Sequence, residues 1–113
     1  MRVEGNTIII PQGDTETLRF TKKHSTTMQY KAWDVAKYEL TIASRVSKEV
    51  VFSSEVEIKE TGVTVLLFPL SSEDTNIAEG DYVYGLRKLI APNYVHTEIL
   101  ENRMKIVRGV KKE

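Results

Sequence analysis

Two histidines are the side chains of this sequence best suited to acid–base chemistry or metal binding near neutral pH: His24 in TKKHSTT and His96 in YVHTE. Neither belongs to a metal-ligand spacing such as His-Glu-x-x-His. His24 is expected in an exposed turn, and alternation places His96 on the outward face of a strand. The sequence therefore favours two surface histidines over a catalytic or metal site.

Carboxylates offer a second kind of chemistry, because paired acids can act in hydrolysis or bind calcium. They form three groups: Glu73 with Asp74, Glu79 with Asp81, and Glu98 with Glu101. A calcium loop needs the order Asp-x-[Asp/Asn]-x-[Asp/Asn]-Gly, which SEDTNIAEGD lacks. Asp74 and Thr75 are instead expected to hydrogen-bond local backbone groups and fix this crossing. A small hydrolase built on the first two groups stays open as a minor hypothesis.

The stretch IIIPQGDT combines a glycine with an acid and a hydroxyl, as a phosphate loop would. Phosphate loops need several glycines before a helix, whereas Gly13 precedes a strand-like segment. Gly13 is therefore expected to supply backbone freedom in a turn, with Asp14 or Thr15 bonding the next amides. Pro11 lacks an amide hydrogen, so it is expected to interrupt the ladder where the first strand switches sheets. No cofactor is expected.

Aromatic side chains could bind a sugar or a partner protein. Tyr30 and Trp33 lie in an irregular segment, where recognition loops tend to occur, and Tyr94 follows a Pro-Asn turn. The competing interpretation is core packing, which accounts for most aromatics in domains of this size. Both interpretations stay open for these three residues.

Composition limits the function classes. The chain has 113 residues, which fits one domain at 1–113, and no cysteine, which excludes disulfides and thiolate metal sites. Its 16 basic residues balance its 16 acidic ones, so nothing favours nucleic-acid binding. No apolar run has the length of a membrane span, and the N-terminus is too polar for a signal peptide. Synthesis in the cytoplasm without membrane insertion is expected.

Period-two alternation is the pattern that repeats along the chain, and it predicts strands. The runs cover 7–10, 15–21, 37–44, 55–61, 62–70, 81–90, 94–100 and 103–107. Turns are expected at 11–14, at 92–93, at 101–102 and at a tight hairpin in KETGV, where Gly62 can take positive φ. A short helical turn is allowed at 33–37. These spacings predict an all-β sandwich or barrel. Together with the tyrosine pattern described next, they lead us to expect an all-β, immunoglobulin-like antiparallel β-sandwich of about 7–9 short strands.

One local pattern is more specific. In AEGDYVYGL, Gly80 precedes Tyr82 and Tyr84 in a Gly-x-Tyr-x-Tyr arrangement. Immunoglobulin-like sandwiches carry a corner tyrosine whose hydroxyl bonds back to the preceding crossing, with a core residue two positions later. Tyr82 fits the corner and Tyr84 the core position, and Gly80 lets the chain bend in before them.

The ordered pair of Gly13-Asp14-Thr15 and, far downstream, Asp74-Thr75 followed by Gly80, Tyr82 and Tyr84 resembles a family of small immunoglobulin-like domains from phages of Gram-positive hosts. The N-terminal domain of the phage baseplate upper protein is a relative of this kind. The resemblance implies a non-enzymatic structural protein of a phage or prophage tail tip or baseplate, acting as an assembly or adaptor module.

The same resemblance implies other tail or baseplate proteins as partners, a homo-oligomer in the particle, and a virion-associated location after synthesis in the host bacterium. It carries over no catalytic residues. The alternative function is a module that binds host-surface carbohydrate or acts in adhesion through Tyr30, Trp33 and Tyr94.

Overall fold

The computed structural model describes residues 1–23, 26–91 and 94–109. Its strands are β1 (Arg2–Glu4), β2 (Thr7–Pro11), β3 (Glu16–Lys23), β4 (Tyr30–Lys31), β5 (Lys37–Ser44), β6 (Val50–Glu57), β7 (Val65–Leu70), β8 (Gly80–Ala91) and β9 (Tyr94–Val107), with one short helix, α1 (Ser72–Thr75), before β8.

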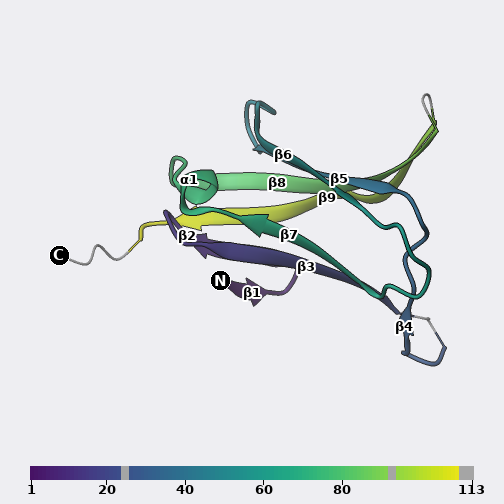
Figure 1. Cartoon of the computed structure of the whole chain (residues 1–113). Helices are drawn as coiled ribbons and strands as arrows, with labels where there is room; N and C mark the ends of the chain where they lie inside the picture. Colours follow the sequence, from purple (N-terminus) through teal and green to yellow (C-terminus); the bar gives the residue numbers. More distant parts are fainter. Residues whose placement is uncertain (24–25, 92–93, 110–113) are drawn as a thin grey trace.

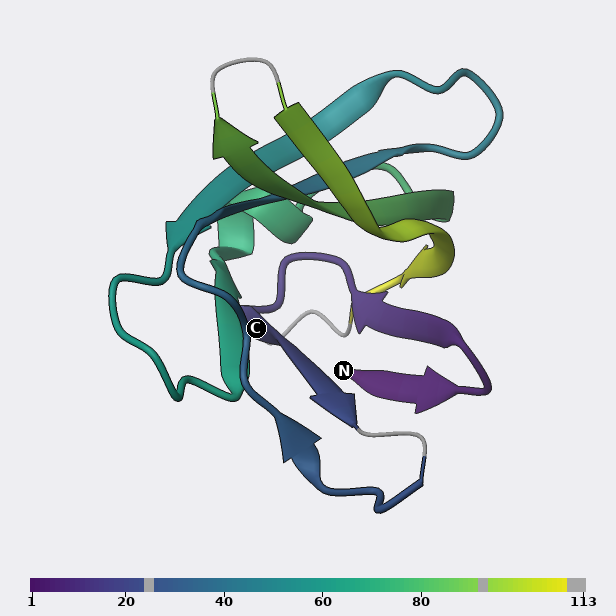
Figure 2. The same ribbon diagram turned by 90° about the vertical axis from the view of Figure 1, so that its right-hand side faces the viewer.

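Two sheets form a β-sandwich, as Figures 1 and 2 show. The larger sheet has the order β1-β2-β9-β8-β5-β6, and the smaller has the order β4-β3-β7. The central β9-β8-β5 strands with β3 and β7 opposite reproduce the immunoglobulin arrangement, in which strands C, F and G face strands B and E. The predicted all-β sandwich is confirmed.

β2 and β9 pair in parallel, with Ile8 opposite Met104 and Pro11 opposite Val107. The other strand pairs of the described chain are antiparallel, so the sandwich is antiparallel except at this one pair. β2 ends at Pro11, and the chain then crosses to the smaller sheet as β3. The predicted switch of sheets at Pro11 is confirmed.

The core lies between the two sheets and follows the predicted alternation. In β3 Leu18 and Phe20 point inward, and in β7 Leu66, Phe68 and Leu70 do so. The rings of Phe20 and Phe68 meet edge to face, with centroids 5.8 Å apart. Each such buried side chain contributes roughly 1.5–3 kcal/mol relative to an exposed position, so this alternating set dominates the stability of the domain.

Strand β7 is an edge strand of the smaller sheet, although its sequence is nearly all apolar. Its outward-facing Leu67 is 49% exposed. Pro69 is consistent with that place, because a proline cannot donate to a ladder on both sides. The KETGV hairpin was wrong: β6 and β7 belong to different sheets, so residues 58–64 cross between sheets, although Gly62 does take positive φ (89°).

Two further boundaries differ. β9 runs through the expected turn at Glu101–Asn102, because Asn102 pairs with Tyr84 and irregular register near Leu86 absorbs the bend. β6 begins at Val50 instead of Glu55, with a register shift beside Ile42 that disturbs the alternation there. The helical turn that the sequence allows at 33–37 is absent from the described chain. The helix forms instead at α1, where Ser71 and Asp74 make a reciprocal capping box.

No helix among the described residues has the length and hydropathy needed to cross a bilayer.

Candidate functional site

Tyr82 makes the hydrogen bond that the corner pattern predicts. Its hydroxyl donates to the carbonyl oxygen of Ala78 at 2.6 Å, and burial raises the pKa of this phenol. Gly80, between the two, has φ of 148°, a conformation that side chains with a Cβ rarely adopt. Tyr84 lies in the core, 6% exposed, with its ring 6.0 Å from that of Phe20. The Gly80, Tyr82 and Tyr84 set therefore turns the chain into β8.

The two motif stretches that are far apart in sequence meet at Thr75. The hydroxyl of Thr75 donates to the carbonyl oxygen of Asp14 at 2.6 Å, and the amide of Gly13 donates to the carbonyl oxygen of Thr75 at 3.3 Å. Thr75 is 2% exposed, the only buried polar residue within the described part of the chain. These residues form a structural junction between the β2–β3 crossing and α1, which we call the Thr75 junction.

Other residues reinforce the Thr75 junction. The side-chain amide of Gln12 donates to the carbonyl oxygen of Ile77 at 2.7 Å. Asp74 accepts from the amide of Ser71 at 2.8 Å, as its expected local role requires. Asp14 acts through its backbone, since its amide donates to the carbonyl oxygen of Pro11 at 3.2 Å, while Thr15 is exposed. The expected side-chain bonds from Asp14 or Thr15 to following amides are thus replaced by backbone bonds that satisfy the turn.

Trp33 is a core residue, so of its two interpretations core packing holds and ligand contact does not. It is 4% exposed, its ring meets that of Tyr38 edge to face at 5.3 Å, and Lys22 Nζ lies 4.3 Å from its ring centroid. Its amide donates to the carbonyl oxygen of Val63 at 2.8 Å, which fixes the loop under one end of the sandwich. Trp33 is therefore closed over the core, whereas residues 26–32 before it are exposed to solvent.

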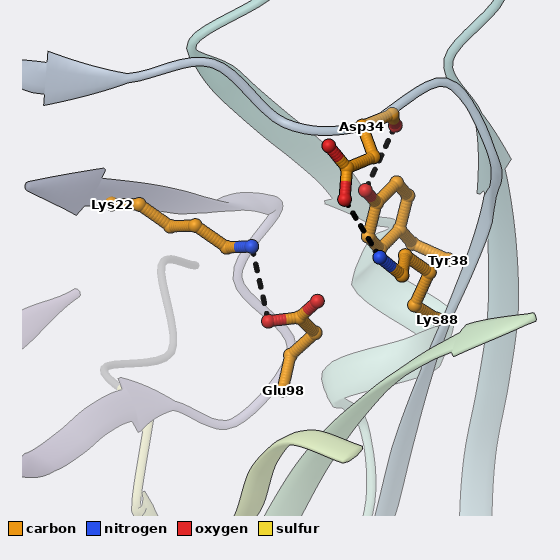
Figure 3. A network of polar contacts seen from close by, with 5 residues as sticks. All are labelled: Lys22, Asp34, Tyr38, Lys88 and Glu98. Atoms are coloured by element: carbon orange, nitrogen blue, oxygen red, sulfur yellow. Dashed lines mark hydrogen bonds and ion pairs between the residues drawn. The ribbon is translucent and has the colours of Figure 1, made fainter. Parts of the chain in front are cut away.

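A polar network that sequence reasoning missed surrounds this end of the sandwich (Figure 3). Lys22 of β3 and Glu98 of β9 form an ion pair at 3.1 Å, which joins the two sheets. Lys88 of β8 and Asp34 form a second at 2.7 Å. The hydrogen bond and charge of Lys88 hold the pKa of Asp34 below its ordinary value.

The same end contains a second corner tyrosine. The hydroxyl of Tyr38 donates to the carbonyl oxygen of Asp34 at 2.8 Å, as the dashed line in Figure 3 marks. The Tyr38 side chain is fully buried, and this burial raises its pKa to about 12. A phenol with so high a pKa is neutral at physiological pH, so its role here is to hold the chain. The sequence did carry a signal for this corner, because Tyr38 lies near the start of a strand that follows an irregular segment. Unlike Tyr82, however, Tyr38 has no glycine two positions before it to mark the corner.

Tyr30 is exposed on the short strand β4. It retains 59% of its accessible surface, and Lys23 Nζ lies 5.3 Å from its ring centroid. Tyr94 is the first residue of β9, and its side chain lies outside the part of the chain that the structure describes. Of the three aromatics considered for ligand contact, Tyr30 is the one whose described side chain is accessible.

Among the described residues, the acidic and imidazole groups do not converge. Across residues 1–23, 26–91 and 94–109, no cluster of three or more acidic, histidine or cysteine side chains has the geometry to hold a metal ion. Asp74 caps α1, and Glu79 pairs with Arg108 at 3.6 Å. His96 is exposed on β9, as expected, and His24 lies outside the described residues.

An apolar groove of about 390 Å³ separates the edges of β6 and β7. Val56, Ile58, Val63 and Leu67 line it, with Glu57, Lys59 and Glu60 at its rim. β6 ends the larger sheet and β7 ends the smaller one, so each has one side without a neighbouring strand in the described chain. Unpaired strand edges carry free amides and carbonyls that another chain can pair with.

No protein-family model matches the chain, and no curated protein matches it.

Proposed function

We propose that the protein is a non-enzymatic structural component of a phage or prophage tail tip or baseplate, acting as an assembly module. The observation that carries this proposal is the Thr75 junction. The resemblance to phage domains rests on two separated motif stretches, and Thr75 joins them through its bonds to Asp14 and Gly13. The motif residues that carry the resemblance therefore serve to hold the fold together. This supports a structural role over a catalytic one.

The strand edges support assembly as the mode of action. The free sides of β6 and β7, with the apolar groove between them, offer backbone pairing and apolar burial to an extended segment of a neighbouring tail protein. In this role the protein is made in the cytoplasm of the host bacterium and is carried in the particle. Its partners are other tail or baseplate proteins, and further copies of itself.

The deciding experiment asks whether the native protein travels with particles. Phage particles induced from the strain that encodes the protein are banded by density, and the fractions are probed with an antibody against it. Co-banding that survives a second gradient, with gold label at the tail tip, is the expected result. Signal confined to the soluble fractions would exclude a virion component.

Carbohydrate binding is the second candidate function, and the exposure of Tyr30 beside Lys23 supports it. An exposed aromatic ring can stack on a sugar face. A glycan panel with the unaltered protein and the Tyr30→Ala variant tests this candidate. Binding that Tyr30→Ala abolishes would support it, and an empty panel would remove it.

A further inference from the structure

A hollow of about 310 Å³ lies on the outer face of the larger sheet, over β1, β2, β9 and β8. The strand register explains its lining. Arg2 pairs with Ile9, Ile9 with Lys105, and Lys105 with Asp81, so these four side chains form one row across the sheet. Neighbouring strands lie about 4.8 Å apart, so the row brings groups from both ends of the chain together.

A second row lies beside the first. Glu4 pairs with Thr7, and Arg103 lies two positions before Lys105 on the same face of β9. Arg45 closes the hollow on the other side, where its amide donates to the carbonyl oxygen of Asp81 at 3.1 Å. The backbone of Met104 and Tyr82, whose side chains belong to the core, contributes to its floor. We call this the basic hollow.

Three cations of the basic hollow are not neutralised. Arg2 pairs with Glu4 at 3.3 Å. Arg45, Arg103 and Lys105 form no ion pair with any carboxylate of the described chain. The protein as a whole has a formal charge of zero, so this concentration of positive charge is local. Unpaired cations held around one concave surface produce a field that attracts anions.

We propose that Arg45, Arg103 and Lys105 bind the phosphate group of a polyol- or sugar-phosphate ligand. A phosphate monoester carries close to two negative charges and three acceptor oxygens, which matches three convergent cations, two of them guanidinium forks. A carboxylate has one charge and needs only one such fork. Thr7 can bind a ligand hydroxyl, and Val107 provides an apolar surface for the carbon chain. This inference does not rest on the proposed function.

Amide NMR titration with glycerol 3-phosphate tests the proposal. Shift changes are expected at residues 45, 81 and 103–105, and they should weaken as sodium chloride is raised, because salt screens exposed charges. Arg45→Gln and Arg103→Gln should each weaken binding about fivefold, as expected for exposed charge contacts. Asp81→Asn should strengthen it by a similar factor, because it removes a negative charge from the site.

Matched controls separate this site from general surface charge. Arg19 is exposed on β3 in the other sheet, so Arg19→Gln removes one positive charge elsewhere and should leave binding unchanged. Neutral glycerol should cause no shift. Absence of shifts at millimolar glycerol 3-phosphate, or an equal loss in Arg19→Gln, would overturn the site. Equal binding of glucuronate would overturn the assignment of phosphate.

Discussion

The hydroxyls of Tyr38 and Tyr82 each donate a hydrogen bond to the carbonyl oxygen of the residue four positions earlier, Asp34 and Ala78, at 2.8 and 2.6 Å. Tyr38 and Tyr82 lie near the starts of β5 and β8, which pair antiparallel with each other. The two corners therefore stand at opposite ends of one strand pair. At each end of the β5–β8 pair, a buried tyrosine hydroxyl therefore holds the segment that leads into the strand.

Both tyrosine corners are expected to contribute measurably to stability. Tyr38→Phe and Tyr82→Phe should each lower the free energy of unfolding by about 1–2 kcal/mol, because each leaves a carbonyl oxygen without its donor. Urea denaturation measures this difference. Tyr30→Phe is the control, since the Tyr30 ring is exposed and should tolerate the change. A neutral Tyr82→Phe would mean that its bond adds nothing to the corner.

The Thr75 junction should also be sensitive to a single atom. Thr75→Val keeps the shape of the side chain but removes the donor to Asp14, so the loss should be about 1–3 kcal/mol. Ser72→Ala, on the exposed side of α1, should change stability by less than about 0.5 kcal/mol. Hydrogen exchange at the Gly13 amide should speed up in Thr75→Val. Unchanged exchange and stability would show that the two motif stretches are held together by other contacts.

Stability should fall at alkaline pH because of Tyr38. Its pKa rises from 10.0 to about 12 on folding, so the folded state keeps its proton where the unfolded chain has lost it. The resulting stabilisation is complete below pH 10 and is lost as pH rises from 10 to about 12. Denaturation at several pH values measures the slope in this window. Tyr38→Phe should show a shallower slope, and an unchanged slope would assign the effect to other groups.

Trp33 should matter for folding. Trp33→Ala removes a buried ring that packs on Tyr38, so stability should fall by about 3–5 kcal/mol. Trp33→Phe should cost less, because it keeps a ring and removes an indole nitrogen that is buried without a hydrogen-bond partner. Urea denaturation tests both variants. A stable Trp33→Ala protein that had lost a sugar ligand would reverse this interpretation.

Gly80→Ala should destabilise through the backbone alone. A Cβ at Gly80 would have no neighbouring atom within 4 Å, so no clash contributes. The φ of 148° is the source of strain, with a cost of about 1–3 kcal/mol. Thermal unfolding measures the change, and a melting curve equal to that of the unaltered protein would exclude strain at this position.

Local patterns predicted much of this fold because they depend on near neighbours in sequence. The alternation of Leu18 and Phe20 predicted which side chains of β3 face the core. Gly80 with Tyr82 predicted the tyrosine corner at the start of β8. Pairing between distant segments leaves no such signal. The parallel match of Ile8 with Met104 and the bond from Thr75 to Asp14 depend on where the chain returns, which a period of two does not encode.

The sites were harder to predict than the fold for a related reason. Trp33 lies in an irregular segment, and only the closure of that segment against Val63 shows that it is buried. The cations of the basic hollow are scattered from Arg2 to Lys105, so their charge looks balanced along the sequence. Strand register is what gathers Arg103 and Lys105 beside Arg45.

The parallel ladder between β2 and β9 also determines how the domain responds to mechanical force. Tension applied at the start of β2 and the end of β9 pulls these two strands in opposite directions along their length. The rungs from Ile8–Met104 to Pro11–Val107 are then loaded in shear, all together, instead of opening one after another. A domain anchored through its two ends would thus hold under tension until the whole ladder failed at once.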